Sequence, residues 1–282
     1  MVRPARPSDK GDLMSFIKDV WGGHDYIPYV WDEWLNGKDG RMFVAEVGGR
    51  AVGMNRVRFM GDGSAWFEGV RVHPDYRGRG LATMLGENSA KVALSEGAKT
   101  FRLVSGSRNK LAHRQIARMG FEEASRISVY APPKRARTPA LRGARRAKPG
   151  EGPRALRAME NSKEFKLGSG VYWDAFAAQS LTLDVVGRLV DAGQVWVSPK
   201  AVAVTAFGGE GSPTWRQVCF IGGDPDEARV LALRLFGLKG GRRPTRKLAY
   251  LPQGSKVITS MREHGFERHG SLILFERKAA KG

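Results

Sequence analysis

The chain has 282 residues, of which 41% are hydrophobic, and it carries a formal net charge of +19. Its length accommodates two ordinary domains with real cores, and its hydrophobic content excludes an intrinsically disordered protein. A single cysteine excludes an internal disulfide, and the five histidines lack the spacing of zinc ligands. No apolar run approaches the ~18 residues of a membrane span. We therefore expect a cytoplasmic protein without a metal.

The first 131 residues are predicted to alternate strands and helices. The first helix is indicated by Leu13, Phe16 and Ile17, whose spacing places them on one face. The predicted elements in chain order are a strand at 2–5, a helix capped by Ser8, an aromatic-rich segment at 21–35, a hairpin at 41–60, a strand at 65–72, a helix from Leu81, a strand at 100–106, a helix at 109–119 and a strand at 121–131.

The helix after the strand at 65–72 is preceded by the glycine-rich stretch "RGRG" at 77–80. Glycine disfavours a helix by about 1 kcal/mol relative to alanine, so bare backbone at this point needs a reason. A helix N-terminus offers unpaired N–H groups and partial positive charge, which together attract an anion such as phosphate. The alternative is an ordinary polar turn between a strand and a helix.

Much of the positive charge lies in residues 132–158, which hold nine Lys or Arg against one acid, Glu151. The stretch is rich in proline and glycine and lacks apolar periodicity, which is typical of a linker. We therefore expect domains at 1–131 and 159–282 joined by a basic linker. Such a linker could hold nucleic acid electrostatically, but we favour a solvated linker.

The two halves contain similar segments, "IARMGFEEASRISVYA" and "SMREHGFERHGSLILF". The pairs Gly120/Gly265 and Phe121/Phe266 have the same spacing of 145 residues. Before the second segment, the chain again follows the order strand, strand, strand, helix. These features predict a duplication of one fold.

Three motifs in the first half resemble the GNAT superfamily of acyl-CoA-dependent N-acetyltransferases. The stretch "VRVHPDYRGRGLATML" matches the family signature (Arg/Gln)-x-x-Gly-x-(Gly/Ala) with Arg77, Gly80 and Ala82, and "VRPARPSD" and "SRNKLAHRQIARMGFEE" match its opening strand and a later helix. The segments "GGHDYIPYVWDEWL" and "FEGVRVHPDYRGRGLA" are also similar to the vertebrate histidine N-acetyltransferase group. The resemblance implies an α/β fold of tandem GNAT-like domains, each a mostly antiparallel mixed sheet flanked by helices.

The resemblance also implies acetyl-CoA as co-substrate. The backbone amides of 79–83 would hold its pyrophosphate, and its pantetheine arm would add like a strand to the free edge at 69–72. The implied coenzyme-binding residues are Val70, Arg71, Val72, Arg77, Gly78, Arg79, Gly80, Leu81, Ala82, Thr83 and Asn109.

Acetyl transfer to an amine requires a base, and Glu68 on the strand before the signature is the candidate. Burial among apolar neighbours would raise its pKa toward neutrality; the alternative is a structural partner for Arg56 or Arg58. A backbone N–H near Val70 would polarise the carbonyl. The family's usual tyrosine acid is replaced by Ile116, so water, His113 or no acid serves the leaving thiolate.

The aromatic-rich segment is predicted to form the acceptor pocket through Asp25, Tyr26 and Trp31, because aromatics with acids suit an amine. The expected acceptor is a small amine or free amino acid, histidine being one candidate. Alternatives are a protein Nα or Lys amine, or a nucleic-acid-associated module that binds through the basic linker. A homodimer is a further expectation.

The second copy is predicted not to bind acetyl-CoA. Where the first copy has its glycines, the second reads "IGGDPDEARVLAL", with Asp224, Asp226 and Glu227 at the helix start. Those carboxylates would satisfy the free N–H groups and repel a pyrophosphate, and Pro225 removes one donor. We expect this copy to cover the acceptor side of the first domain or to dimerise.

Overall fold

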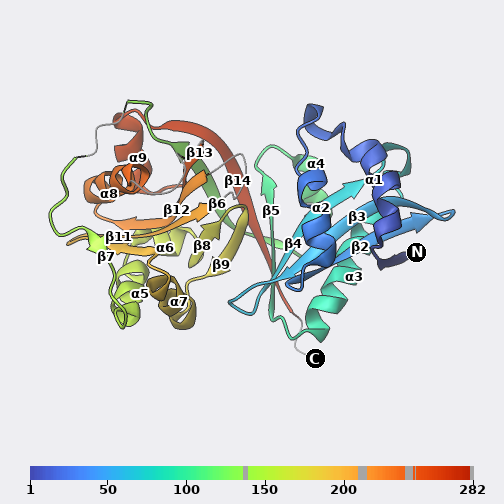
Figure 1. The fold of residues 1–282 in the computed structure, drawn as a ribbon, viewed down its shortest axis with the longest axis horizontal. Coiled ribbons are helices and arrows are strands. Elements are labelled where there is room, and N and C mark those ends of the chain that lie inside the picture. Colours follow the sequence, from blue (N-terminus) through green and yellow to red (C-terminus); the bar gives the residue numbers. More distant parts are fainter. Residues whose placement is uncertain (136–138, 209–214, 239–243, 245, 280–282) are drawn as a thin grey trace. The chain divides into compact units, whose positions relative to one another are not determined.

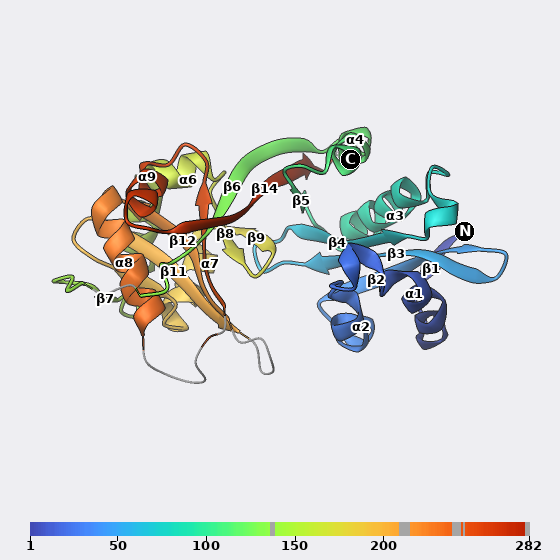
Figure 2. The same ribbon diagram turned by 90° about the horizontal axis from the view of Figure 1, so that it is seen from above.

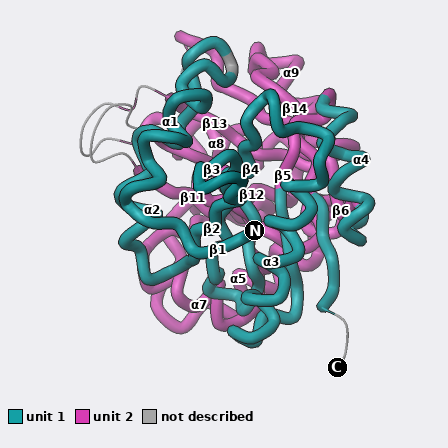
Figure 3. Tube along the Cα trace, turned by 90° about the vertical axis from the view of Figure 1, so that its right-hand side faces the viewer, with its two compact units in different colours: residues 1–103, 109–122, 275–282 teal, residues 104–108, 123–274 magenta. Residues whose placement is uncertain are grey.

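A computed structural model of the chain describes residues 1–135, 139–208, 215–238, 244 and 246–279. These residues form two compact units, coloured separately in Figure 3, and neither unit is one uninterrupted stretch of sequence. Unit 1 comprises Met1–Leu103, Asn109–Glu122 and Phe275–Gly282, and unit 2 comprises Val104–Arg108 and Glu123–Leu274. No helix in the described ranges is both long and apolar enough to cross a bilayer.

Unit 1 is a mixed sheet flanked by helices (Figure 1). Strands β1 to β5 lie in chain order, and each neighbouring pair is antiparallel except β4 and β5, which are parallel because α3 crosses between them. Its elements are β1 (Val2–Pro4), α1 (Lys10–Ile17), α2 (Ile27–Asn36), β2 (Gly40–Val47), β3 (Arg50–Phe59), β4 (Ala65–Val72), α3 (Leu81–Ser95), β5 (Thr100–Gly106) and α4 (Lys110–Arg118), followed by the end of β14 (Glu267–Lys278). Of the two divided strands, unit 1 contains β5 up to Leu103 and β14 from Phe275.

Helices α1 and α2 cover one face of this sheet and α3 covers the other (Figure 2). Leu13, Ile27 and Trp31 from α1 and α2 pack with Met42 and Met54 of β2 and β3 in a buried cluster. Because both faces are covered, β2 and β3 are buried along nearly their whole length, and the buried stretch of β3 includes the polar residues Asn55 and Arg56. The first helix begins at Lys10 rather than Ser8, because a turn of 3₁₀ helix occupies Pro7–Asp9.

Unit 2 has the same design. From β6 its strands run β6-β13-β12-β11-β10-β7, antiparallel except β12 with β13, and β8 and β9 form a separate hairpin. Its elements are β6 (Glu122–Ala131, from Glu123), β7 (Arg145–Arg146), α5 (Gly152–Glu160), α6 (Lys163–Leu167), β8 (Val171–Asp174), β9 (Ala177–Ser180), α7 (Leu183–Asp191), β10 (Val195–Val197), β11 (Ala201–Gly208), β12 (Trp215–Gly223), α8 (Pro225–Gly237), β13 (Arg246–Pro252), α9 (Lys256–Glu263) and β14 to Leu274.

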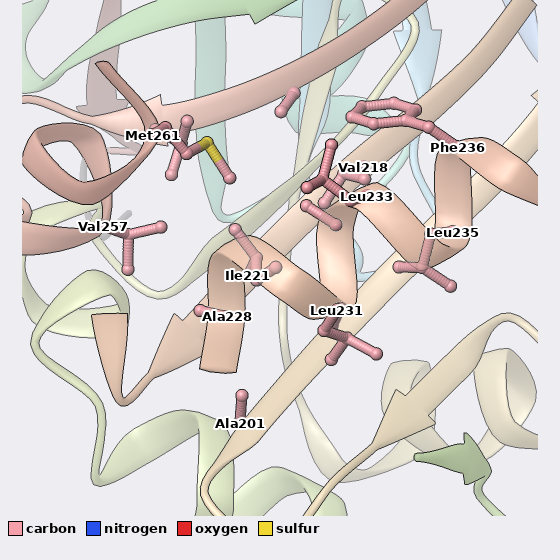
Figure 4. Close-up of a cluster of buried hydrophobic side chains, with 14 of the residues drawn as sticks. Ala201, Val218, Ile221, Ala228, Leu231, Leu233, Leu235, Phe236, Val257 and Met261 are labelled. Carbon is pink, nitrogen blue, oxygen red and sulfur yellow. The ribbon is translucent and has the colours of Figure 1, made fainter. Parts of the chain in front are cut away.

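The two faces of this second sheet have separate cores. On one face, Ala201 of β11 lies in a cluster with Leu231 of α8 and Met261 of α9, as Figure 4 shows. On the other face, Val202 of the same strand packs with Val185 of α7. Successive side chains of a strand point to opposite faces, so a strand covered on both sides must be apolar throughout.

The order of elements confirms the predicted tandem fold. In unit 1, two antiparallel strand pairs lead to β4, and α3 then connects β4 to a parallel β5 followed by α4. In unit 2, two antiparallel pairs lead to β12, and α8 connects it to a parallel β13 followed by α9. From β2 to α4 in unit 1 and from β10 to α9 in unit 2, the strands and helices therefore follow the same order, and unit 2 has the β8–β9 hairpin in addition.

The second copy begins inside the stretch that was predicted as a linker. The opening pattern Arg-x-Ala-x-Pro-x-acid occurs at 3–9 and again at 145–151. Arg3 forms an ion pair with Asp9 at 2.8 Å, and Arg145 forms one with Glu151 at 2.6 Å. Strand β7 and helix α5 thus correspond to β1 and α1, so the ordered elements start earlier than the predicted boundary at 159; residues 136–138 of the predicted linker lie outside the described residues.

The end of the chain belongs to unit 1 rather than to unit 2. Glu276 accepts a hydrogen bond from Arg102 of β5 at 2.8 Å, and Arg277 donates to the Met119 carbonyl at the end of α4 at 2.7 Å. The Arg277 guanidinium also lies 5.2 Å from the centre of the Phe101 ring. This differs from the predicted contiguous domains, because strand pairing joins segments that are distant in the sequence.

Candidate active site

The turn between β4 and α3 presents bare backbone at the start of a long helix. Gly78 and Gly80 have φ angles of +79° and +76°, and α3 begins at Leu81 with Gly80 as its N-cap residue. No side chain in the described part of the chain caps this helix. A Cβ on either glycine would meet nothing within 4 Å, so open space adjoins both residues. An anionic group can therefore approach the positive end of α3.

Two arginines flank this turn and remain available for an anion. The Nε of Arg77 donates to the Val72 carbonyl at 3.2 Å, and Arg79 donates to the Asp75 carbonyl at 3.2 Å and stacks on Tyr76 at 5.0 Å. Both side chains are exposed, and neither forms an ion pair with a residue that the structure describes. Their contacts hold them beside the turn while their charge stays uncompensated.

Next to this turn, β4 separates from β5. The two strands pair only at Ala65–Phe101 and Trp66–Arg102, so the rest of β4 has no partner from β5. A bulge in the pairing with β3 falls at Gly69. This position requires glycine, because its φ is +69° and because an added Cβ would lie 2.6 Å from the Trp34 ring. Val70 beyond it is 42% exposed. An extended ligand can add to this edge.

Glu68 lies just before the bulge in a buried network of charges. Arg56, which is 2% exposed, donates to Glu68 at 2.6 Å and to Asp39 at 2.6 Å. Burial raises the pKa of the Glu68 carboxyl above its ordinary value, although Arg58 and Arg56 act in the opposite direction. The carboxylate is both desolvated and bonded to Arg56, so the structure is compatible with either prediction for Glu68, a general base or a structural partner of arginine.

Arg58 lies beside Glu68 with unused hydrogen-bonding capacity. Its Nε is 3.7 Å from the Glu68 carboxylate, and its side chain is 29% exposed. That Nε is buried and has no hydrogen-bond partner among the described residues. A buried donor without a hydrogen-bond partner is costly, and the ion pair with Glu68 offsets only part of that cost.

The predicted acceptor residues occupy three different environments. Trp31 is fully buried in the core under α2, and Asp25 is 2% exposed and bonds Arg71 at 2.6 Å. Tyr26 is 39% exposed and packs edge-on against Trp34 at 5.8 Å. The structure therefore gives no support to Trp31 and Asp25 as ligand contacts, because neither side chain reaches solvent, whereas Tyr26 does. The Arg71 side chain bonds Asp25, so a cofactor at this edge would contact mainly the backbone of Arg71.

Helix α4 carries the second predicted contact region. The Asn109 side chain accepts a hydrogen bond from the Ala112 N–H at 3.2 Å and so caps the helix. Ile116, at the position of the missing tyrosine, is 6% exposed. The His113 ring lies 5.3 Å from the Phe275 ring, so the end of the chain flanks this helix.

Comparison with known proteins finds a family match for part of this chain. Residues 12–121 match the family described as "Acetyltransferase (GNAT) family". These residues form a GNAT acetyltransferase domain. The GNAT domain is similar to a histidine N-acetyltransferase of Xenopus tropicalis, with 38% identity over 76 residues that cover 26% of this chain and 23% of that protein. A histidine N-acetyltransferase of Oreochromis niloticus is 32% identical over 82 residues, covering 29% of this chain and 24% of its own length.

These curated relatives are thus matched over about a quarter of their length. Along the whole chain, the fold resembles a putative acetyltransferase from Thermoplasma acidophilum, with a TM-score of 0.61, 16% identity and coverage of 99% of this chain and 100% of the other. A tandem GNAT protein from the clavulanic acid biosynthesis pathway has a TM-score of 0.58 and 14% identity, with coverage of 100% and 99%. At such identities the likeness concerns the fold alone, and it supports the tandem architecture.

The start of α8 in unit 2 differs from the start of α3 in the GNAT domain. Asp224 is the N-cap residue of α8, and its side chain accepts a hydrogen bond from the Glu227 N–H at 3.0 Å. Pro225 occupies the first turn together with two acidic residues. The positive end of α8 is thus satisfied from within the chain, whereas that of α3 has no side-chain cap.

GNAT acetyltransferases use acetyl-CoA, and the GNAT domain fits this molecule at two points. The uncapped start of α3 suits a pyrophosphate, and the unpaired edge of β4 suits an extended pantetheine arm. In the ranges that the structure describes, no group of three or more His, Cys, Asp or Glu side chains could hold a metal ion.

Two features of the GNAT domain were not predicted from sequence. Asp39, which shares Arg56 with Glu68, precedes β2 without any motif around it. The contacts of Phe275 and Arg277 with α4 join segments more than 150 residues apart in the sequence, for which local patterns provide no signal.

Proposed function

We propose that the protein is an acetyl-CoA-dependent N-acetyltransferase that transfers the acetyl group directly to the amine of a small molecule or free amino acid. The observation that carries this proposal is the uncapped N-terminus of α3 beside an unpaired edge of β4 that contains a half-buried carboxylate, Glu68. The match of residues 12–121 to the acetyltransferase family supports the same activity.

In this proposal, the first-turn N–H groups of α3, Leu81 to Thr83, bind the pyrophosphate, with Gly78 and Gly80 leaving the approach open. Arg77 and Arg79 supply positive charge from the exposed side of the turn. The backbone of Val70 to Val72 binds the pantetheine arm, and the free amide nitrogen of Asn109 meets the coenzyme from α4. The support is the free strand edge and the two arginines without ion-pair partners.

Acetyl-CoA, when bound, supplies the thioester that reacts. Glu68 accepts a proton from the acceptor ammonium, directly or through water, and its raised pKa makes it a better base than an exposed glutamate. The amine nitrogen then forms the new C–N bond while the C–S bond breaks and the thiolate leaves. The Val70 N–H, on the unpaired edge, stabilises the carbonyl oxygen. Because Ile116 cannot donate a proton, a water molecule relays to the leaving thiolate the second proton that the nitrogen loses on becoming an amide. The thiol formed in this way has a pKa of about 8.5.

Arg58 favours a free amino acid over a simple amine as the acceptor. Its buried Nε lacks a partner, and its guanidinium lies 3.7 Å from the proposed base. The amino and carboxylate groups of an α-amino acid are separated by one carbon, so a carboxylate on Arg58 would hold the amine close to Glu68. The similarity to histidine N-acetyltransferases makes histidine the first amino acid to test.

The test is thiol release from acetyl-CoA by the full chain with a panel of free amino acids, amino-acid amides, polyamines and short peptides. We expect the highest kcat/KM with a free amino acid. Turnover only with peptides would replace this proposal by the protein Nα or Lys alternative, and no turnover together with tight nucleic-acid binding would favour the nucleic-acid alternative. The stoichiometry of the chain in solution, measured alongside, tests the expected homodimer.

A further inference from the structure

Unit 2 contains a cavity of about 400 Å³ that the proposed acetyltransferase site does not use. It lies among α5, β7 and the turn between β10 and β11, and every lining residue belongs to unit 2. Ala155 and Val202, both about 1% exposed, form part of its apolar wall. Pockets that bind small organic molecules have volumes of roughly 300–1,000 Å³, so the cavity has the size of a ligand site.

The charged residues of this cavity are mostly cations. Arg145, Arg154 and Lys200 line it together with one acid, Glu151. Glu151 is already bonded to Arg145 at 2.6 and 2.8 Å and accepts a third bond from the Lys148 N–H at 2.7 Å. Neither Arg154 nor Lys200 forms a salt bridge within the described residues. The cavity therefore carries more positive than negative charge, on Arg154 and Lys200 side chains that solvent also reaches.

At the corresponding place in unit 1, an acid bonds the hairpin. Helices α1 and α5 share the same register, because Asp9 and Glu151 are their N-cap residues, and Asp12 and Arg154 each follow three positions later. The Asp12 carboxylate accepts a hydrogen bond at 3.0 Å from the Ala51 N–H in the β2–β3 hairpin and lies 3.6 Å from Arg50. It thereby ties α1 to the hairpin of the first copy.

Arg154 reverses this interaction in the second copy. A guanidinium has no acceptor atom, so it cannot bond a backbone N–H of the β10–β11 hairpin, and the Ala201 N–H bonds the Ser198 hydroxyl at 3.1 Å instead. Lys200 at the turn carries the same charge as Arg154 and repels it. An acid that joins helix and hairpin in one copy is thus replaced by a cation that lines an open cavity in the other.

We propose that this cavity binds a small organic anion, a carboxylate or phosphate monoester with an apolar portion. Arg154 and Lys200 bind the anionic group, and the wall that includes Ala155, Ala158 and Val202 receives the apolar portion. This site goes beyond the proposed acetyltransferase function and shares no residue with it. It also gives the second copy a role of its own.

The test measures binding of phenyl phosphate and of benzoate to the full chain by calorimetry at low ionic strength, with neutral benzamide as the comparison compound. We expect one saturable site for an anionic probe, weakened by added salt, and none for benzamide. The two anionic probes distinguish a phosphate site from a carboxylate site. Absence of saturable binding by both anions overturns the proposal.

Two variants assign the binding to the cavity. Arg154→Asp restores the acid of the first copy and should weaken binding at least about tenfold, as the loss of a charged hydrogen bond does. Ala158→Trp fills the cavity without changing charge and should abolish binding. The matched control is Arg157→Asp, which makes the same charge change on an exposed residue of α5 outside the cavity lining. Equal loss of binding in the Arg154 and Arg157 variants would show that only net charge matters and would overturn the site.

Discussion

Glu68 combines two properties that usually oppose each other in a carboxylate. It is bonded to a buried arginine, which stabilises the charged form, yet burial raises its pKa. Arg56 is shared with Asp39, so its charge is divided between two carboxylates. Arg56 therefore holds Glu68 in a fixed position while burial raises its pKa, a combination that suits the base we propose.

Replacing Glu68 by Gln removes the base but keeps a hydrogen-bond acceptor for Arg56. We expect kcat near neutral pH to fall by on the order of 10² or more, with unchanged acetyl-CoA affinity. In the wild type, kcat/KM should rise with pH through the Glu68 pKa, which lies above the ordinary glutamate value, because only the deprotonated form accepts a proton. The pH–rate profile measures this. The control is Asp39→Asn, which alters the exposed partner of Arg56 and should keep the rise of kcat/KM with pH. An unchanged rise in Glu68→Gln would assign the base elsewhere.

Arg58 should determine whether the acceptor needs a carboxylate. Arg58→Ala should raise KM for a free amino acid by roughly 10- to 100-fold, since a hydrogen bond to a charged group contributes about 1.5–3 kcal/mol. The same variant should leave KM for the corresponding amino-acid amide nearly unchanged, because that acceptor lacks the carboxylate. Steady-state kinetics with both acceptors measures the difference, and equal losses for both would refute a role in recognising the carboxylate.

At the scale of elements, the contrast between α3 and α8 separates the two copies. Both helices connect a strand to a parallel neighbour, yet α3 begins after a glycine without a side-chain cap and α8 begins with a capping aspartate. Capping residues such as Asp224 stabilise a helix by about 1 kcal/mol. The first copy forgoes this stabilisation and keeps its N–H groups available for a ligand.

Gly80→Phe should raise the Kd of acetyl-CoA at least about 100-fold, because the ring would occupy the space in front of α3. The φ of +76° makes any side chain costly by roughly 1–2 kcal/mol. Gly97→Phe is the matched control, since Gly97, beyond the other end of α3, has φ of +83° and equally open surroundings. Calorimetry and thermal unfolding should show similar destabilisation in both variants but loss of affinity only in Gly80→Phe. Unchanged affinity in that variant would remove the proposed cofactor site.

The capped start of α8 predicts one acetyl-CoA site per chain. Asp224 already binds the first-turn N–H of Glu227, and the neighbouring carboxylates repel phosphate. Titration of the full chain with acetyl-CoA, followed by calorimetry, should therefore give a stoichiometry near one. Two sites of comparable affinity would show that the second copy also functions as a coenzyme domain.

At the scale of the whole molecule, the chain returns to unit 1 after completing most of unit 2. Arg102, 5% exposed, bonds both Asp62 at 2.7 Å and Glu276 at 2.8 Å, so the last strand closes a buried ion network. Arg277 packs over Phe101 and Phe121 and bonds the end of α4. The folding of the first copy thus depends on the final residues of the sequence.

A chain truncated after Leu274 should lose the folded state of unit 1 and with it acetyl-CoA binding. Removing one partner from a buried ion pair costs about 3–5 kcal/mol, and the truncation also uncovers Phe101. Lys278→Ala, which removes only a 72% exposed lysine, should change stability by less than about 1 kcal/mol. Urea unfolding and calorimetry provide the measurements, and full-affinity binding by the truncated chain would contradict this dependence.

Features encoded by neighbouring residues could be predicted from the sequence. The tandem fold, the start of α3 and the acidic start of α8 each depend on short contiguous stretches, because helix caps and glycine turns are formed by local backbone. The repeated pattern at 145–151 carried a similar signal for the start of the second copy. Comparison of 3–9 with that stretch would have placed β7 and α5 in the second copy.

The sequence by itself determined the family, the duplicated order of elements and the position of the proposed coenzyme site. Only the tertiary structure decided which of the candidate side chains are buried: Trp31 and Asp25 lie in the interior, and Arg58 carries a buried donor without a hydrogen-bond partner among the described residues. It alone also assigned the last strand to unit 1 and opened a cavity beside Arg154. The physical reason is that periodicity defines the faces of a helix or strand, while burial and pairing depend on contacts between segments far apart in the chain.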